Sequence, residues 1–194
     1  MISIIYAHPL KDSLNASILK AVGEKFNNKG LEYSVLDLYQ DGFDPVFKPE
    51  EQTGYFTGEG THDPLVKKYQ ESLAASSQLV FIFPIWWNEQ PAIVKGFIER
   101  VCLPGFGFKY TEQGVAPLLT NIKEVTVLTT SGAPDHALKN YCGNIIENQF
   151  INNIIRPITG LNTAKWMNLG LASSSPEQIK EHIASVSDLF EIER

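Results

Sequence analysis

Polar and aromatic side chains that could do chemistry gather in three segments of the sequence, and each segment directly follows an apolar run. The first segment, YAHPLKDSLNAS, holds His8, Ser13, Asn15 and Ser17 around the start of an expected helix. Backbone N–H groups and short hydroxyl or amide side chains at a helix N-terminus bind phosphate groups well. The segment is therefore a candidate phosphate site. In the alternative interpretation, Ser13 or Asp12 only caps the helix and His8 is an ordinary loop residue.

The second segment, FIFPIWWNEQP, ends a buried apolar run with two adjacent tryptophans, although the whole chain contains only three. Side chains alternate along a strand, so Trp86 and Trp87 cannot both point into the core. At least one is expected at the mouth of the sheet, where it could hold a flat, partly apolar ligand while the backbone of residues 85–88 binds the ligand's polar edge. The alternative is that the tryptophans pack against the helix that starts at Pro91.

The third segment, TTSGAPDHAL, offers the hydroxyl groups of Thr129, Thr130 and Ser131, followed by Gly132. Glycine lets the backbone approach a ligand closely because it has no Cβ. These residues are therefore candidate ligand contacts.

The apolar runs that precede these segments belong to a regular series of expected strands and helices. Runs rich in Val, Ile and Phe predict strands at residues 2–7, 32–38, 78–85, 124–130 and 163–171. Helical spacing predicts helices at about 15–28, 64–76, 91–102, 137–153 and 176–190. Strict alternation with near-continuous apolar strands indicates an α/β protein whose parallel sheet is covered on both faces.

Five strand–helix units suit the three-layer flavodoxin-like arrangement, a five-stranded parallel sheet with strand order 2-1-3-4-5. In that order the first, third and fourth strands are neighbours, and ligands bind beyond the carboxyl ends of the first and third. The three segments described above follow those three strands, so one site would unite them. The length of 194 residues predicts a single domain, 1–194. The long irregular segment 39–63 is expected to be a functional lid or an interface arm.

Composition argues against several classes of function. The net charge of −6, without a Lys/Arg-rich run, gives no electrostatic footprint for nucleic acid or an anionic membrane surface. The G-x-G-x-x-G fingerprint of dinucleotide-binding folds is absent from the first loop, and the G-x-G at Gly105 and Gly107 follows an expected helix. Cys102 and Cys142 have neither CxxC spacing nor a neighbouring His cluster, so we expect buried free thiols and no metal site.

The sequence also predicts no targeting or membrane-spanning segment. The N-terminus, MISIIYAHP, enters an apolar strand without a basic region or a small-residue cleavage site. The longest apolar run, LVFIFPIWW, is far too short to span a bilayer. A cytoplasmic protein is therefore expected.

The chain resembles a known family in five motifs that occur in the family's order: YAHP...SLN, DLYQDGFDPVF, FPIWWNEQPAIVKGFIERV, GFGFKY and TTSG. The family is that of the flavodoxin-fold NAD(P)H:quinone oxidoreductases, which includes small bacterial quinone reductases and the ancillary reductases of potassium-efflux systems. The resemblance covers about residues 3–135 and is weaker beyond them.

The resemblance implies a flavin cofactor, with NAD(P)H as co-substrate. FMN is favoured over FAD, because no groove for an adenosine half is evident in the sequence. The family pattern places the flavin phosphate near His8, Ser13, Leu14, Asn15 and Ser17. It places the isoalloxazine edge against Pro84, Ile85, Trp86, Trp87 and Asn88, and the pyrimidine side against Thr129, Thr130, Ser131, Gly132 and Ala133. It also implies a homodimer whose substrate pocket lies over the flavin at the subunit interface.

The resemblance further suggests a proton donor and a substrate slot. Family members often place a Tyr, and sometimes a His, just after the TTSG turn, but here Leu138 stands about where the Tyr is often found. His136 and Tyr141 are therefore the candidate catalytic residues, the alternative being a surface His and a helix-packing Tyr. Phe108 and Tyr110 would form an aromatic slot for nicotinamide and quinone rings, or else pack a dimer interface.

The leading hypothesis is a dimeric flavin-dependent NAD(P)H oxidoreductase that passes hydride, by a ping-pong route, to quinones or similar planar acceptors. One alternative is a flavin-containing regulatory subunit of a potassium-efflux system, which would bind a membrane transport protein. Another is a one-electron carrier. Carriers need an exposed flavin edge and no nicotinamide slot, whereas segments 39–63 and 104–116 could build such a slot, so this alternative is disfavoured.

Overall fold

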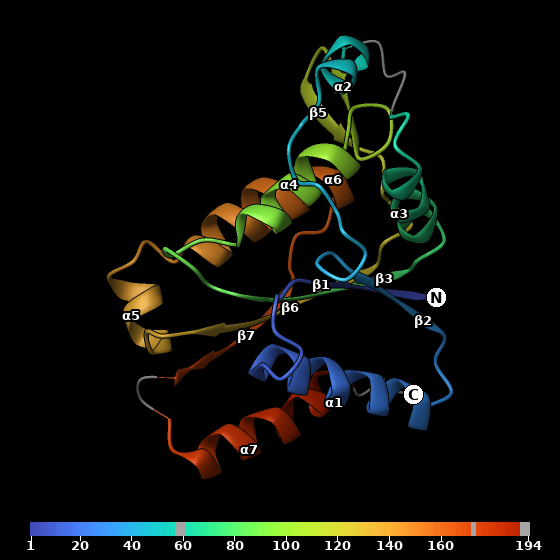
Figure 1. The fold of residues 1–194 in the computed structure, drawn as a ribbon. Helices are drawn as coiled ribbons and strands as arrows, with labels where there is room; N and C mark the ends of the chain where they lie inside the picture. Colours follow the sequence, from blue (N-terminus) through green and yellow to red (C-terminus); the bar gives the residue numbers. More distant parts are fainter. Residues whose placement is uncertain (57–60, 172–173, 191–194) are drawn as a thin grey trace.

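The computed structural model describes residues 1–56, 61–171 and 174–190, and its centre is a five-stranded parallel sheet (Figure 1). The strands of this sheet are β1 (Ile2–Tyr6), β2 (Tyr33–Asp37), β3 (Gln78–Pro84), β6 (Glu124–Ser131) and β7 (Lys165–Gly170). Their order across the sheet is β2-β1-β3-β6-β7, and every neighbouring pair is parallel. The expected α/β fold and strand order are confirmed, because β6 and β7 are the fourth and fifth strands of this sheet.

Helices cover both faces of the sheet (Figure 1). One face carries α1 (Leu14–Asn28), α7 (Pro176–Val186) and the short 3-10 helix η3 (Ser187–Phe190). The other carries α3 (Pro64–Ala74), α4 (Ala92–Val101), η1 (Ile146–Ile155) and α6 (Arg156–Thr159). Each face has its own apolar core, since neighbouring strand residues such as Ile4 and Ile5 point to opposite sides. Within the described ranges, no helix is both long and apolar enough to cross a membrane.

The helix expected at 137–153 is not continuous. Helix α5 (Asp135–Asn140) ends early, and the chain resumes helical structure only at Ile146, as the π-helix η1. Between them, Gly143 and Asn144 have φ angles of 74° and 49°. This left-handed backbone conformation ends a helix, and both glycine and asparagine tolerate it.

In segment 39–63, the described residues around helix α2 (Pro49–Gly54) form an arm that projects from one end of the molecule (Figure 1). Beside it lies a two-stranded antiparallel hairpin made of β4 (Phe108–Thr111) and β5 (Gly114–Pro117), within a stretch for which sequence reasoning expected only a loop. The pattern was missed because the strands are short and largely exposed.

Arg100 of α4, only 1% exposed, pins the arm to the body of the protein. Its Nε and Nη2 atoms donate to the Glu51 carboxylate at 2.8–3.0 Å, and Nη2 also donates to Asp63 Oδ2 at 2.8 Å. Its Nη1 donates to the Asp44 carbonyl at 2.6 Å. Burial acts to raise the pKa of Glu51 and of Asp63, but hydrogen bonds, chiefly from Arg100, outweigh it and hold both pKa values below the ordinary range.

We expect Arg100→Met to lower the free energy of unfolding by about 3–5 kcal/mol near neutral pH, because it leaves the buried Glu51 carboxylate without its partner. The loss should shrink at about pH 3. Because the pKa values of Glu51 and Asp63 are lowered in the folded chain, their stabilisation is present above the ordinary carboxyl pKa and disappears as pH falls through the folded-state pKa. Urea unfolding at both pH values measures the effect.

Lys95→Met is the matched control. Lys95 also lies on α4 and pairs with Glu99 at 2.7 Å, but the two side chains are 47% and 46% exposed. An exposed pair contributes at most about 1 kcal/mol, so this variant should unfold nearly as the wild type does. Equal losses in the two variants would contradict the assignment of Arg100 as the residue that holds the arm.

Candidate functional site

The carboxyl ends of β1, β3 and β6 bring the three segments together at one edge of the sheet (Figure 1). Pro84 pairs with Thr130 in the β3–β6 register, and the N–H of Ile85 donates to the Thr130 carbonyl at 2.7 Å. On the other side, the ring centroids of His8 and Trp86 lie 6.1 Å apart. We call these loops the strand-end rim, which comprises residues 8–17, 84–88 and 129–133.

The first loop of the rim is shaped by its own side chains. Ser13 Oγ accepts the N–H of Ala16 at 3.1 Å and thereby caps α1. The Nδ1 atom of His8 accepts the N–H of Leu10 at 3.1 Å. Ser17 is exposed, and its hydroxyl donates to the Ser13 carbonyl at 3.4 Å. Ser13 therefore caps the helix and His8 hydrogen-bonds within its own loop, as in the alternative interpretation. A ligand contact by either residue stays a prediction.

Asn15 differs from its neighbours in the first turn of α1, where it follows the half-buried Leu14. Its side chain is 1% exposed, yet neither Oδ1 nor Nδ2 has a hydrogen-bond partner in the described chain. A buried amide left unpaired costs about 1–3 kcal/mol, so a native chain normally satisfies it. The first N–H groups of a helix also lack partners inside the helix. The amide and the helix start together make this part of the rim a candidate site for a polar ligand, and a ligand contact by Asn15 stays a prediction.

The second loop is a tight turn that displays its tryptophans. Trp86 and Glu89 exchange two backbone hydrogen bonds of 3.0 Å, and both central residues have positive φ, 53° at Trp87 and 63° at Asn88. These values match a type I′ turn, a conformation that a bulky residue rarely adopts. Trp86 is 42% and Trp87 is 99% exposed. The prediction that the two cannot both enter the core is confirmed, and Trp87 does not pack against the following helix.

Two hydroxyl side chains of the third loop form hydrogen bonds inside the protein. The Thr129 hydroxyl, fully buried, donates to Asn168 Oδ1 at 2.8 Å, and Ser131 Oγ accepts from Asn168 Nδ2 at 2.9 Å. Both hydroxyls, expected as ligand contacts, thus form hydrogen bonds within the protein. Gly132 is exposed, and a Cβ added there would meet nothing within 4 Å. The open side of this turn is therefore at Gly132.

Sequence reasoning missed two residues of β7 that support the third loop. Trp166 Nε1 donates to Thr129 Oγ1 at 2.9 Å. Asn168 Nδ2 donates to Asp135 Oδ1 at 2.7 Å as well as to Ser131. The signal was present in the run TAKWMNLGL, because a polar side chain within a buried strand must find partners.

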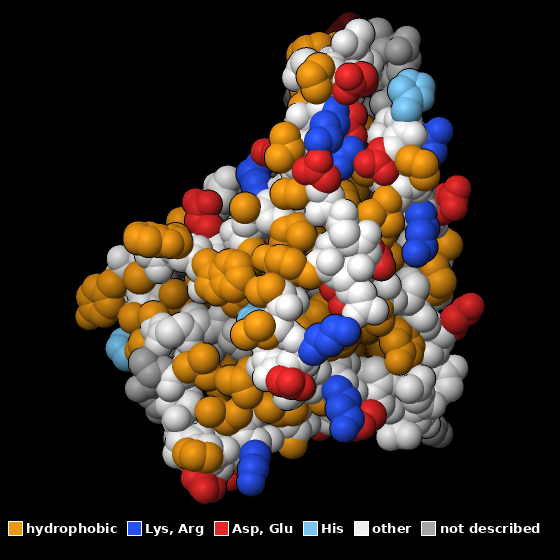
Figure 2. Space-filling model, viewed as in Figure 1, with side chains coloured by type: hydrophobic (Ala, Val, Ile, Leu, Met, Phe, Trp, Pro, Cys, Tyr) orange, Lys and Arg blue, Asp and Glu red, His pale blue; other side chains and the backbone are white. Residues whose placement is uncertain are grey.

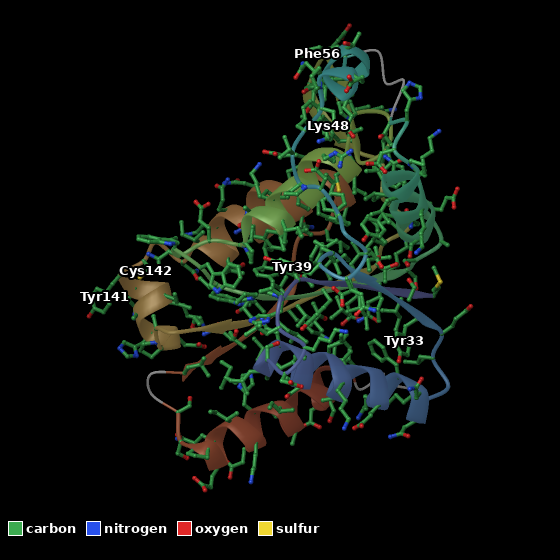
Figure 3. The ribbon with its side chains drawn as sticks, in the orientation of Figure 1. Tyr33, Tyr39, Lys48, Phe56, Tyr141 and Cys142 are labelled. Carbon is green, nitrogen blue, oxygen red and sulfur yellow. The ribbon has the colours of Figure 1, made fainter. Side chains whose placement is uncertain are left out.

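The candidate proton donors lie beyond the rim on the exposed side of α5. His136 is exposed, and Tyr141 is 82% exposed at the end of α5 (Figure 3). Neither side chain hydrogen-bonds another residue of the described chain, so their catalytic role stays a prediction. The adjacent Cys142 is half-buried rather than buried as expected, whereas Cys102 is buried and burial raises its thiol pKa to about 12.

Phe108 and Tyr110 do not reach the rim of their own chain. Their rings contact each other edge to face, with centroids 5.4 Å apart, and Tyr110 stacks on Phe56 of the arm at 6.5 Å. Figure 3 shows Phe56 at the tip of the arm, far from Tyr141 beside the rim. Tyr110 is 56% exposed there. If these aromatic residues complete a substrate pocket, they must do so in a second copy of the chain.

Hydrophobic side chains gather on the side of the molecule where α5 and the neighbouring loops lie (Figure 2). Trp86, Trp87 and Tyr141 are among the exposed hydrophobic residues of the chain. Apolar surface of this kind, next to unpaired polar groups, is typical of a ligand site or a protein interface.

Known proteins resemble this chain in both sequence and structure. A relative from Cavia porcellus, NAD(P)H dehydrogenase (quinone) 1, is 31% identical over 158 residues, which are 73% of this chain and 58% of the relative. A relative from Clostridium perfringens, the FMN-dependent NADH:quinone oxidoreductase, is 32% identical over 116 residues, which are 58% of each chain. The chain thus spans little more than half the length of the curated relatives that it matches.

The crystal structure of Smu.1420 from Streptococcus mutans UA159 superposes with a TM-score of 0.82 at 29% sequence identity, and the match covers 97% of both chains. The family model described as "Flavodoxin-like fold" matches residues 1–184. The strand order and the position of the rim at the carboxyl ends of β1, β3 and β6 agree with this match. The chain therefore belongs to the flavodoxin-like fold family.

Proposed function

We propose that this chain is an FMN-dependent NAD(P)H oxidoreductase of the quinone reductase type, which reduces quinones or similar planar acceptors by a ping-pong route. The observation that carries the proposal is the buried amide of Asn15 at the start of α1, which has no partner among the described residues, beside a loop that exposes two tryptophans. The names of the two relatives described above supply the reaction class and the cofactor. Those relatives lend no support to a transport-system subunit.

The described residues fit a flavin. The N–H groups at the start of α1 and the Asn15 amide nitrogen would donate to the phosphate. Trp86 and Trp87 would lie along the isoalloxazine ring, with the backbone of Pro84 and Ile85 at its edge. The open Gly132 lets the third loop approach the pyrimidine side. When bound, a flavin accepts hydride from nicotinamide and passes it to a second substrate.

A homodimer would complete the pocket over the ring. The exposed Tyr110 stacks on Phe56 of the arm and contacts Phe108, so a partner could present these rings to the rim of this chain. Aromatic rings on both sides of a planar substrate favour stacking and discriminate weakly between acceptors. His136 or Tyr141 would supply the proton, and the cytoplasm is the proposed location.

The first test is the visible absorption spectrum of the purified, desalted protein, alone and under anaerobic NADPH or NADH. We expect flavin bands that bleach directly to the two-electron reduced form. A protein that stays colourless after incubation with excess FMN and FAD would overturn the proposed function. A stable semiquinone during the reduction would instead favour a one-electron carrier.

Asn15→Leu should weaken FMN binding at least about tenfold, because the phosphate loses its hydrogen bonds to the amide. The same change should leave the cofactor-free protein as stable as the wild type, or more so, because it removes an unpaired buried amide. Flavin fluorescence titration and thermal unfolding measure the two effects.

Thr126→Val is the matched control, because the Thr126 hydroxyl on β6 is also buried and unpartnered in the described chain. It should affect stability in the same direction and leave FMN affinity unchanged. If both variants bound FMN as the wild type does, Asn15 would have no part in the cofactor site.

Mixing two impaired variants tests the shared pocket. Tyr110→Ala should lower turnover with a quinone, and Asn15→Leu should lower it at FMN concentrations too low to fill the weakened site. A mixed dimer contains one site with both an intact Asn15 and a partner's intact Tyr110, so unfolding and refolding the two variants together should restore part of the activity. Size-exclusion chromatography identifies the dimer. Activity that never exceeds the sum of the separate variants would contradict a pocket shared between subunits.

A further inference from the structure

Asn168 of β7, 7% exposed, binds the turn after β6 at three points. Its Oδ1 accepts the Thr129 hydroxyl at 2.8 Å, and its Nδ2 donates to Ser131 Oγ at 2.9 Å and to Asp135 Oδ1 at 2.7 Å. An ionised carboxylate can only accept hydrogen bonds, so the amide nitrogen must face Asp135. The orientation of the amide, and with it the direction of each hydrogen bond, is therefore fixed.

This direction determines what the Ser131 hydroxyl can do. Since Ser131 Oγ accepts from Asn168, its own hydrogen is left for the Ala133 carbonyl, which lies 2.6 Å away. The Thr129 hydroxyl likewise donates its hydrogen within the protein, to Asn168 Oδ1. Neither hydroxyl can then donate to a ligand, and the ligand side of the turn is left to its backbone around Gly132.

Strand β7 also supports the turn through its backbone. A Cβ added at Gly170 would lie 2.7 Å from the Cα of Pro134 and 2.8 Å from the carbonyl oxygen of Ala133. The turn therefore rests directly on Gly170, two residues beyond Asn168. The amide and this close contact together hold the turn, while a Cβ at Gly132 would meet nothing within 4 Å.

We propose that Asn168 is a positioning residue for the cofactor site: without touching the ligand, it fixes the turn 129–135 and directs the Ser131 hydroxyl away from the flavin. The inference rests on the proposed function. Its physical basis is that one amide satisfies two acceptors and one donor, which no other side chain of similar size can do.

The test is Asn168→Asp, which keeps the size of the side chain and removes both N–H donors. Ser131 would then donate to the new carboxylate and release the Ala133 carbonyl, while two carboxylates would face each other at Asp135. We expect the dissociation constant for FMN to rise at least about tenfold at neutral pH.

Among the described residues, the other charged or titratable groups beside the pair are Lys139, whose Nζ lies 3.8 Å from Asp135 Oδ2, and His182, which lines the same cavity. Facing carboxylates raise each other's pKa, so a proton returns to the pair as pH falls and restores one donor. The ratio of variant to wild-type dissociation constants should therefore decrease on acidification.

Two controls separate positioning from general loss of stability. Leu169→Ala removes a neighbouring β7 side chain, 3% exposed, that lies outside the hydrogen-bond network. It should lower the melting temperature without a comparable loss of FMN affinity. The double variant Asn168→Asp with Asp135→Asn restores a donor facing an acceptor and should recover part of the FMN affinity.

Flavin fluorescence titration of the apoproteins across pH, with thermal unfolding of each, decides the question. Wild-type affinity in Asn168→Asp would overturn the inference. The inference would also be overturned if the loss of FMN affinity in Asn168→Asp did not change with pH and Leu169→Ala, at an equal loss of melting temperature, lost the same affinity. A wild-type chain that fails to bind FMN would overturn the proposed function together with this inference, whereas normal binding by the wild type and by Asn168→Asp would overturn the inference alone.

Discussion

Parallel pairing of β1, β3 and β6 is the constraint on which the candidate site depends. The backbones of these central strands, which are buried on both faces, hydrogen-bond to the neighbouring strands. The positions of the strand ends are therefore fixed relative to one another. The hydrogen bond from Ile85 to Thr130 carries this pairing one step past the sheet into the loops. Strand pairing therefore brings loops from distant parts of the sequence to one rim.

Two buried polar groups of this fold, Arg100 and Asn15, differ in whether they have hydrogen-bond partners. Arg100 finds carboxylate or carbonyl partners for Nε, Nη1 and Nη2, and it makes the arm part of the body of the protein. Asn15 finds none among the described residues, although it is equally buried. A satisfied cluster fixes a shape, whereas an unsatisfied buried group costs free energy until it finds a partner. Asn168 is intermediate, because it is satisfied within the protein but supports a loop of the proposed cofactor site.

The sequence predicts the sheet well, since near-continuous apolar runs have few alternatives to a buried parallel strand. It predicts the break in helix 137–153 poorly, because the left-handed residues Gly143 and Asn144 lie inside an otherwise helical pattern. The hairpin at 108–117 was missed because its exposed strands lack an apolar periodicity. At the site, residue types identified the three loops. They could not show that Thr129 and Ser131 bond inward, which depends on a strand more than thirty residues away.

The type I′ turn at Trp87 and Asn88 has a spectroscopic consequence. Trp86 and Trp87 lie on the second loop, and the third tryptophan of the chain, Trp166, hydrogen-bonds Thr129 beneath the third loop. Two indoles of the protein thus lie on the second loop, one of them almost fully exposed to water, whereas the residue of the third pairs with Val127 in the middle of β6. Part of the ultraviolet emission of this chain therefore originates at the rim, and the exposed indoles report on whether that end of the sheet is occupied.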